Sequence, residues 1–214
     1  MLLKYISAAC WMALAASAAQ PLPELRVEPT AGGSIFYIKN GSTEPLTAYL
    51  IELVDYPGSY YAMWQDDVST PMAPGAEKRI QISNMTVGAV PDYVKMQAAI
   101  FADGSSSGMP EKVTQLVERR RFTLATTREL IGRLEKAQSA GTAKALVIAD
   151  LRQWAGSIEP QGRPNRNSQT TINQAAGRSL IADAAAGLDA HSIKEELARL
   201  GASEKALAAS KPPL

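Results

Sequence analysis

The chain has 214 residues, of which 46% are hydrophobic, and its 22 basic and 21 acidic residues nearly balance. That length is enough for one large domain or two small ones, and the balance lacks the concentrated basic excess of nucleic-acid-binding proteins. The single cysteine is Cys10. The chain beyond the first 19 residues therefore has no disulfides, thiol nucleophiles or cysteine-ligated metal and iron–sulfur sites.

Residues 1–19 are predicted to be a secretory signal peptide. A start with one positive charge at Lys4 is followed by an apolar run from Tyr5 to Ala16 and by small residues up to Ala19. These are the three parts of a signal peptide, with cleavage after Ala18 or Ala19. We therefore expect a secreted or periplasmic protein with no stable membrane span after cleavage.

Two alternatives to cleavage remain open. A retained membrane anchor requires about 20 apolar residues, and this run is shorter and rich in alanine. A lipoprotein is the second alternative, because Ser7-Ala8-Ala9 precedes Cys10. However, Ser7 is not leucine, and the apolar run continues well past the cysteine.

Residues 20–109 are predicted to form a β domain. Strands are expected at 34–39, 46–56, 60–64, 78–83 and 93–102, with turn-forming residues between them. In the second run Leu46, Ala48 and Leu50 are expected to face one way and Tyr49, Ile51 and Leu53 the other, so both faces are covered. In the last run Val94, Met96, Ala98 and Ile100 are expected to point inward.

Five to seven short strands with regular turns favour an antiparallel sandwich of the immunoglobulin or fibronectin type. The sequence lacks the Cys…Trp…Cys pattern of antibody domains. The expectation therefore concerns architecture only, and it covers about 80 residues.

From Pro110 onward the hydrophobic period changes to that of helices, so 110–201 is predicted to be a region of three to four helices. One helix is expected from Pro110 to about Gln138, with a possible restart at Thr126. A second helix is expected after Thr142. A third is expected to run from Gln169 and end at Gly187.

The fourth helix is predicted to begin with a capping box at Ser192 and Glu195 and to stop at Gly201. Residues 202–214 are predicted to be a flexible tail. The fold class is thus α+β, with a sandwich followed by helices. Residues 20–109 carry net charge −5 and residues 110–214 carry +5, which supports two differently built parts.

An aromatic stretch, Tyr60-Tyr61-Ala62-Met63-Trp64, provides the candidate binding residues Tyr60, Tyr61 and Trp64. Aromatic side chains beside a sandwich can form a flat platform for a carbohydrate or a peptide. The alternative is that Tyr61 and Trp64 fill the core, which is what most aromatic residues do.

Charged residues offer two further candidates. Asp66 and Asp67 are the best acidic pair, although neighbours on a strand point to opposite faces. Arg119, Arg120 and Arg121 point in three directions around their helix. Arg120 either pairs with an acidic group of the sandwich or lies on a solvated face.

No catalytic constellation is evident. His191 is the only histidine, and the G-x-S-x-G, G-x-x-x-x-G-K-[ST] and G-x-G-x-x-G motifs are absent. We expect no catalytic residues, no metal site and no cofactor.

The first functional hypothesis is a non-catalytic binding or structural module of the cell envelope with a protein or carbohydrate ligand. The alternatives are a carboxylate-based hydrolase that uses Asp66 or Asp67, and an assembly or chaperone-like factor that uses an exposed helix groove.

Overall fold

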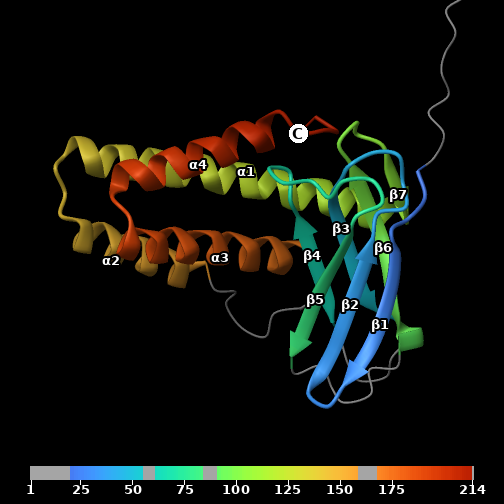
Figure 1. Ribbon diagram of the computed structural model, residues 1–214. Coiled ribbons are helices and arrows are strands. Elements are labelled where there is room, and N and C mark those ends of the chain that lie inside the picture. Colours follow the sequence, from blue (N-terminus) through green and yellow to red (C-terminus); the bar gives the residue numbers. More distant parts are fainter. Residues whose placement is uncertain (1–19, 55–60, 84–90, 159–167, 214) are drawn as a thin grey trace, which may run out of the picture.

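The computed structural model describes residues 20–54, 61–83, 91–158 and 168–213 and shows an α+β fold (Figure 1). The strands are β1 (Glu24–Thr30), β2 (Gly33–Lys39), β3 (Leu46–Leu53), β4 (Ala62–Asp66), β5 (Glu77–Ser83), β6 (Val94–Phe101) and β7 (Ser106–Gly108). The helices are α1 (Pro110–Ser139), α2 (Lys144–Ser157), α3 (Gln169–Ala190) and α4 (Ile193–Ala208), with a short 3-10 turn at Pro91–Tyr93. The predicted order of strands followed by helices is confirmed.

The strands form two antiparallel sheets, in the orders β1-β2-β5 and β4-β3-β6-β7. The sheets pack face to face in the manner of a sandwich, and we call them together the two-sheet unit. Their shared core consists of Phe36, Ile38, Leu46, Tyr49, Ile51, Val94, Ala99 and Phe101. Strand β3 is buried on both faces, as predicted, because its second face is covered by α1.

Two β-bulges change which face the residues of β3 and β6 take. Register shifts lie between Leu46 and Ala48 on β3 and opposite the Leu50–Ile51 step, where β6 has one extra residue, Gln97. A shift of one residue turns every following side chain to the other face.

The predicted faces of these two strands were therefore wrong in part. Leu46 joins the core between the sheets, whereas Ala48 and Leu50 face α1. Likewise, Met96 packs against the core between the sheets, whereas Ala98 and Ile100 face the helix.

Helix α1 begins directly after β7 and lies on the outer face of the four-stranded sheet. Leu116 is buried there against Ala48, Leu50, Ala98 and Ile100. The helical and β regions therefore meet in a packed apolar interface.

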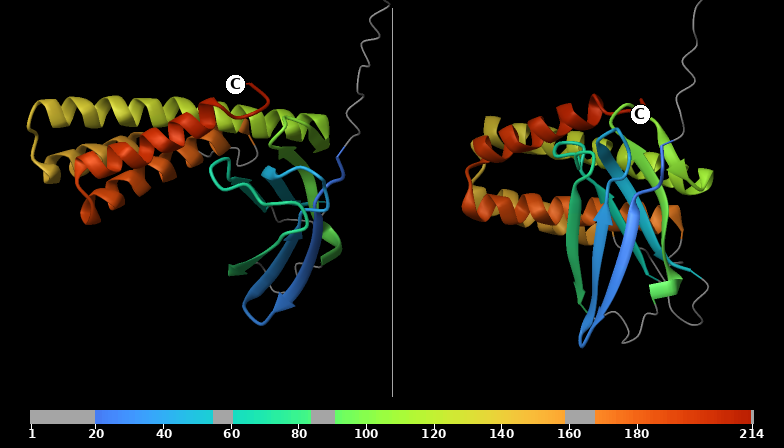
Figure 2. Two further views of the ribbon diagram at one scale, coloured as in Figure 1. Left: turned by 45° about the horizontal axis from the view of Figure 1, so that its top comes forward. Right: turned by 45° about the vertical axis from the view of Figure 1, so that its right-hand side comes forward.

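The four helices run alternately away from the two-sheet unit and back towards it (Figures 1 and 2). We call them the helical arm. α1 is 30 residues long, which corresponds to about 45 Å. The core of the arm consists of Leu130, Leu134, Val147, Ile148, Leu151, Ala155, Ile181, Ala184, Ala185, Leu188 and Leu200. The C-terminus returns to the two-sheet unit, while α2 lies at the far end of the arm.

Several helix boundaries differ from the sequence-based expectations. α1 does not restart at Thr126, whose hydroxyl donates a hydrogen bond to the carbonyl oxygen of Phe122 within the same helix. α3 continues past Gly187, and α4 continues past Gly201 to Ala208, so the predicted end there was wrong. The reason lies in the tertiary structure: Leu207 is buried, and its burial stabilises the additional turns of α4. The capping box at Ser192 and Glu195 is confirmed.

Candidate functional site

The aromatic stretch is divided between two packing environments. Tyr61 contacts Phe36 edge-to-face with 6.1 Å between ring centroids, at the core between the sheets. Trp64 packs against the interface with α1, and the Arg119 guanidinium lies 5.7 Å from its ring centroid. Tyr60 lies outside the described residues. Both described rings thus have packing partners, and ligand binding by Tyr60, Tyr61 and Trp64 stays a prediction.

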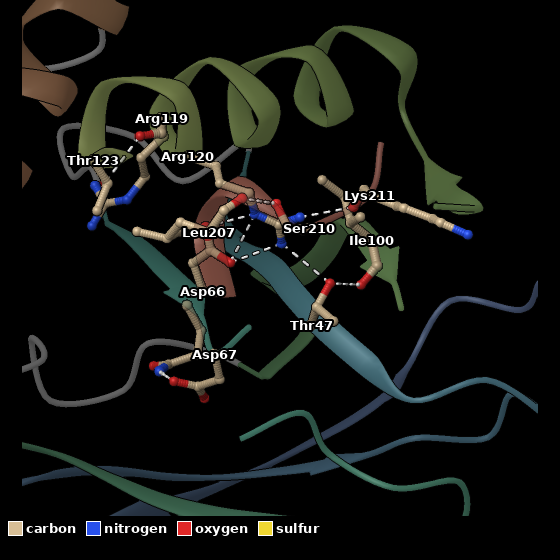
Figure 3. A network of polar contacts seen from close by, with 11 residues as sticks. Thr47, Asp66, Asp67, Ile100, Arg119, Arg120, Thr123, Leu207, Ser210 and Lys211 are labelled. Atoms are coloured by element: carbon tan, nitrogen blue, oxygen red, sulfur yellow. Dashed lines mark hydrogen bonds and ion pairs between the residues drawn. The ribbon is translucent and has the colours of Figure 1, made fainter. Parts of the chain in front are cut away.

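The acidic pair is separated by the alternation of β4. Asp66 points towards α1, whereas Asp67 points the other way (Figure 3). The Asp67 carboxylate accepts hydrogen bonds from Lys78 on β5 at 3.0 Å and from Gln65 at 2.7 Å. Each carboxylate therefore has its own polar partners.

Arg120 is completely buried, with 0% of its surface exposed, and it binds three separate parts of the chain. Nε donates to both oxygens of Asp66 at 3.1 and 3.0 Å, and Nη2 donates to Oδ1 at 2.8 Å. Nη2 also donates to the Thr47 hydroxyl at 3.1 Å, and Nη1 donates to the Lys211 carbonyl oxygen at 2.9 Å (Figure 3). We call Arg120, Asp66, Thr47 and Lys211 the Arg120 network.

The bulge on β3 positions the Thr47 hydroxyl in this network. Thr47 lies at the register shift, and its hydroxyl donates to the carbonyl oxygen of Ile100 at 3.0 Å while accepting from Arg120. The network therefore connects the four-stranded sheet, α1 and the segment after α4. Of the two alternatives that the sequence left for Arg120, the structure shows the pairing with an acid of the β half and not the solvated face, and nothing in the local sequence indicated Thr47 or Lys211.

A second ion pair crosses the same interface. Lys112 Nζ on α1 lies 2.7 Å from the buried Glu52 carboxylate on β3. Lys112 and Arg120 are eight residues apart on one helix, or about 12 Å. Two polar attachments at that separation orient α1 on the sheet, and the apolar contacts between them hold it there.

Burial also affects the electrostatics of the network. Desolvation raises the pKa of the Asp66 carboxyl above its ordinary value, and the hydrogen bonds and charge of Arg120 oppose this only in part. Desolvation likewise lowers the pKa of the neighbouring Arg119. Burying these charged groups costs free energy, so the stability of the fold depends on each of them keeping its partner.

We predict a pH signature of Asp66. Its folded-state pKa is raised, so the folded chain binds this proton more tightly than the unfolded chain. The contribution to stability is therefore fully present below the unfolded value near 3.8 and is lost as pH rises through the folded pKa. Urea unfolding at acidic pH should show this slope in the original chain and not in Asp66→Asn. An identical pH dependence in both would contradict it.

A groove lies between α1 and α2 at the far end of the arm. Its volume is about 800 Å³, and it is lined by Glu129, Gly132, Arg133, Lys136, Ala137, Ala140, Thr142, Leu146, Val147, Asp150 and Leu151. Leu146 is 65% exposed, the largest exposure among the big hydrophobic side chains that the structure describes. The sequence did not indicate where such a groove would lie, because its walls belong to two different helices.

Arg133 closes one side of this groove. Its guanidinium lies 4.2 Å from the Trp154 ring centroid and forms ion pairs with Glu129 at 2.9 Å and Asp150 at 3.4 Å. The α1 and α2 walls are thus connected at that level by charge and stacking. The remaining surface of the groove is open and mainly apolar.

Within the described ranges, no group of three or more His, Cys, Asp and Glu side chains has a metal-binding arrangement. His191 is exposed at the C-cap of α3, next to the capping box. In the same part of the chain, no helix has the length and apolar character needed to cross a membrane.

No protein-family model, no curated protein and no solved structure matches the chain. The assignment of a function therefore depends on the geometry of the network and the groove.

Proposed function

We propose that this chain is an exported, non-catalytic binding or structural module of the cell envelope, and that the helical arm is its binding part. The observation that supports this most directly is the open apolar groove between α1 and α2, with Leu146 exposed on its edge. Apolar grooves between helices are common docking sites for apolar side chains or amphipathic helices.

The attachment of the arm supports the same role. A groove at the end of a freely moving arm would be ordered only on binding, at an entropic cost. Here α1 is anchored on the sheet by apolar packing, by Lys112 and by the buried Arg120. We propose that the two-sheet unit is an immunoglobulin- or fibronectin-like base for the arm. Its strand order supports this comparison, because β3 and β6 are the central strands of the four-stranded sheet.

The proposed location rests on residues 1–19, which lie outside the described residues. Their charge, apolar run and small-residue end support export to the envelope or the exterior. An assembly or chaperone-like role is the form of this proposal that the groove favours.

The hydrolase alternative has less support. Asp66 is engaged through both carboxylate oxygens by Arg120, and Asp67 is paired with Lys78. These contacts favour structural roles for both carboxylates. Hydrolytic activity lost in both Asp66→Asn and Asp67→Asn, with folding retained, would restore this alternative.

One labelling experiment addresses both export and groove binding. Because Cys10 lies in the leader, a cysteine introduced elsewhere is the only thiol of the processed chain. Leu146→Cys places that thiol on the groove, and Ala198→Cys places it on the exposed surface of α4 as a matched control. Intact cells and the dilute purified protein are treated with a membrane-impermeant maleimide.

We expect both thiols to be labelled in cells, and position 146 to be labelled several-fold more slowly in cells than in the purified protein. The control at position 198 should show no such slowing. Labelling only after lysis would contradict export. Equal rates at position 146 in cells and in dilute solution would contradict an occupied groove.

A further inference from the structure

One buried hydroxyl group in the two-sheet unit has no hydrogen-bond partner. Tyr49 on β3 is only 2% exposed and belongs to the core between the sheets. Its hydroxyl forms no hydrogen bond with any of the described residues. A buried donor without a partner costs free energy, so folded proteins rarely keep one without a reason.

Among the described residues, the other buried side-chain atom of this kind is Gln169 Oε1. The amide nitrogen of the same side chain donates to the Gln115 carbonyl oxygen on α1 at 3.3 Å and to Asn173 Oδ1 at 2.8 Å. Gln169 therefore fastens the start of α3 to α1. Tyr49 differs, because its hydroxyl is its only polar side-chain group and is not engaged at all.

Burial keeps the Tyr49 hydroxyl protonated. Desolvation raises its pKa above the ordinary value of 10.0, and the negative charge of Asp67 raises it further. At any pH near neutrality the group is therefore a neutral hydrogen-bond donor. A partner that supplies an oxygen lone pair would use this donor.

The core at Tyr49 is closed by side chains on the side between β4 and β5. Tyr49 pairs with Gln65 on β4, and β4 and β5 are edge strands of separate sheets, so no backbone ladder joins them. Across this side, Lys78 and Asp67 form an ion pair at 3.0 Å, with both side chains partly exposed. Met63 on β4 is likewise only partly buried. These side chains can move without breaking a ladder.

Methionine side chains give this core the ability to change shape. Met63, Met72 and Met96 pack against the core between the sheets, and all three are only partly buried. Methionine is unbranched and flexible, so it fills irregular spaces and adapts to a bound ligand. Movement of these side chains would make room for a small molecule beside the Tyr49 ring.

From these observations we propose that the core at Tyr49 is a binding site for a small, largely apolar molecule with one oxygen that accepts a hydrogen bond, such as a phenol or an alcohol. The apolar body takes the place of methionine side chains, and the oxygen accepts from the Tyr49 hydroxyl. Water fits less well, because a buried water makes about three hydrogen bonds and this core offers it mainly apolar neighbours. The site is independent of the groove in the helical arm.

Phenol and benzene are matched probes for this site, because they share a ring and differ by one hydroxyl group. Their binding is measured by NMR titration of the chain from Gln20 onward, of Tyr49→Phe and of Tyr37→Phe. Tyr37→Phe is the control, because the Tyr37 hydroxyl already donates to Glu28 at 2.9 Å. We expect the phenol-to-benzene affinity ratio to fall about five- to ten-fold in Tyr49→Phe and to stay unchanged in Tyr37→Phe.

The thermal stability of Tyr49→Phe is a second readout. Since the hydroxyl has no partner in the free chain, its removal should leave the melting temperature unchanged or raise it. A fall of several degrees would indicate that the hydroxyl already bonds an ordered water, which would overturn the proposal. It would also be overturned if phenol did not bind at millimolar concentrations, or if Tyr49→Phe kept the affinity ratio of the original chain.

Discussion

Replacing Arg120 with alanine is expected to destabilise the chain by about 3–5 kcal/mol, a large part of the total stability of a typical domain. The guanidinium is fully buried and holds both oxygens of Asp66. Its loss leaves the largely buried Asp66 carboxylate without this cation and the Lys211 carbonyl oxygen without this donor. For a chain of this length, the melting temperature should fall by roughly 6–20 °C.

Arg121→Ala is the matched control, because its side chain is exposed on the next position of the same helix. Its effect should stay within about 0.5 kcal/mol. Arg120→Lys should not rescue, since one ammonium group cannot reproduce the forked contacts. Arg120→Met combined with Asp66→Leu should recover part of the loss, because it removes both buried charges. Equal stabilities of Arg120→Ala and Arg121→Ala would contradict the structural role of the network.

Gly108→Ala is expected to cost about 2–5 kcal/mol, of which about 1–2 kcal/mol is for a left-handed backbone and about 1–3 kcal/mol is for overpacking. Gly108 has φ of +100°, and an added Cβ atom would lie 2.2 Å from the carbonyl oxygen of Gln97. That contact is with backbone at the β6 bulge, and it has no flexible side chain to move aside. β7 would have to separate from β6 just before α1 begins. Urea denaturation would measure the loss.

Gly201→Ala is the same glycine-to-alanine replacement, but it is expected to stabilise the chain. Gly201 lies inside α4, and an added Cβ atom meets nothing within 4 Å. Alanine should therefore stabilise the chain by about 1 kcal/mol. A loss of stability would instead indicate that α4 ends at this glycine, and a harmless Gly108→Ala would contradict the close approach of β7 to Gln97.

The predictable parts of the fold depend on neighbouring residues. The change from strand to helix at Pro110 follows from the hydrophobic period, and the start of α4 follows from Ser192 and Glu195. The burial of both faces of β3 followed from the apolar residues that its sequence places at both sets of alternating positions. Each of these signals lies within a few positions of the structure that it predicts.

The remaining parts depend on residues far away in the sequence. Thr47 and Gln97 become bulges only through the pairing of β3 with β6, and this pairing turned the faces of both strands. The continuation of α4 past Gly201 likewise depends on the burial of Leu207. A single glycine cannot indicate whether a later turn will be buried.

The candidate sites likewise combine features that neighbouring residues predict with features that depend on distant segments. Three consecutive arginines on a helix show from their spacing that they point in different directions, so one of them can pair with the β half. That Arg120 binds Asp66, and also a carbonyl group 91 residues away, was decided by the docking of α1 and the return of α4.

By itself, the sequence determined the succession of strands and helices, the thiol-free character of the chain beyond Cys10 and the opposite net charges of its two halves. Only the tertiary structure decided the partners of Arg120, the separation of Asp66 from Asp67 and the open groove beside Leu146. The physical reason is that periodicity and capping act over a few residues, whereas burial is a property of surfaces that distant segments bring together.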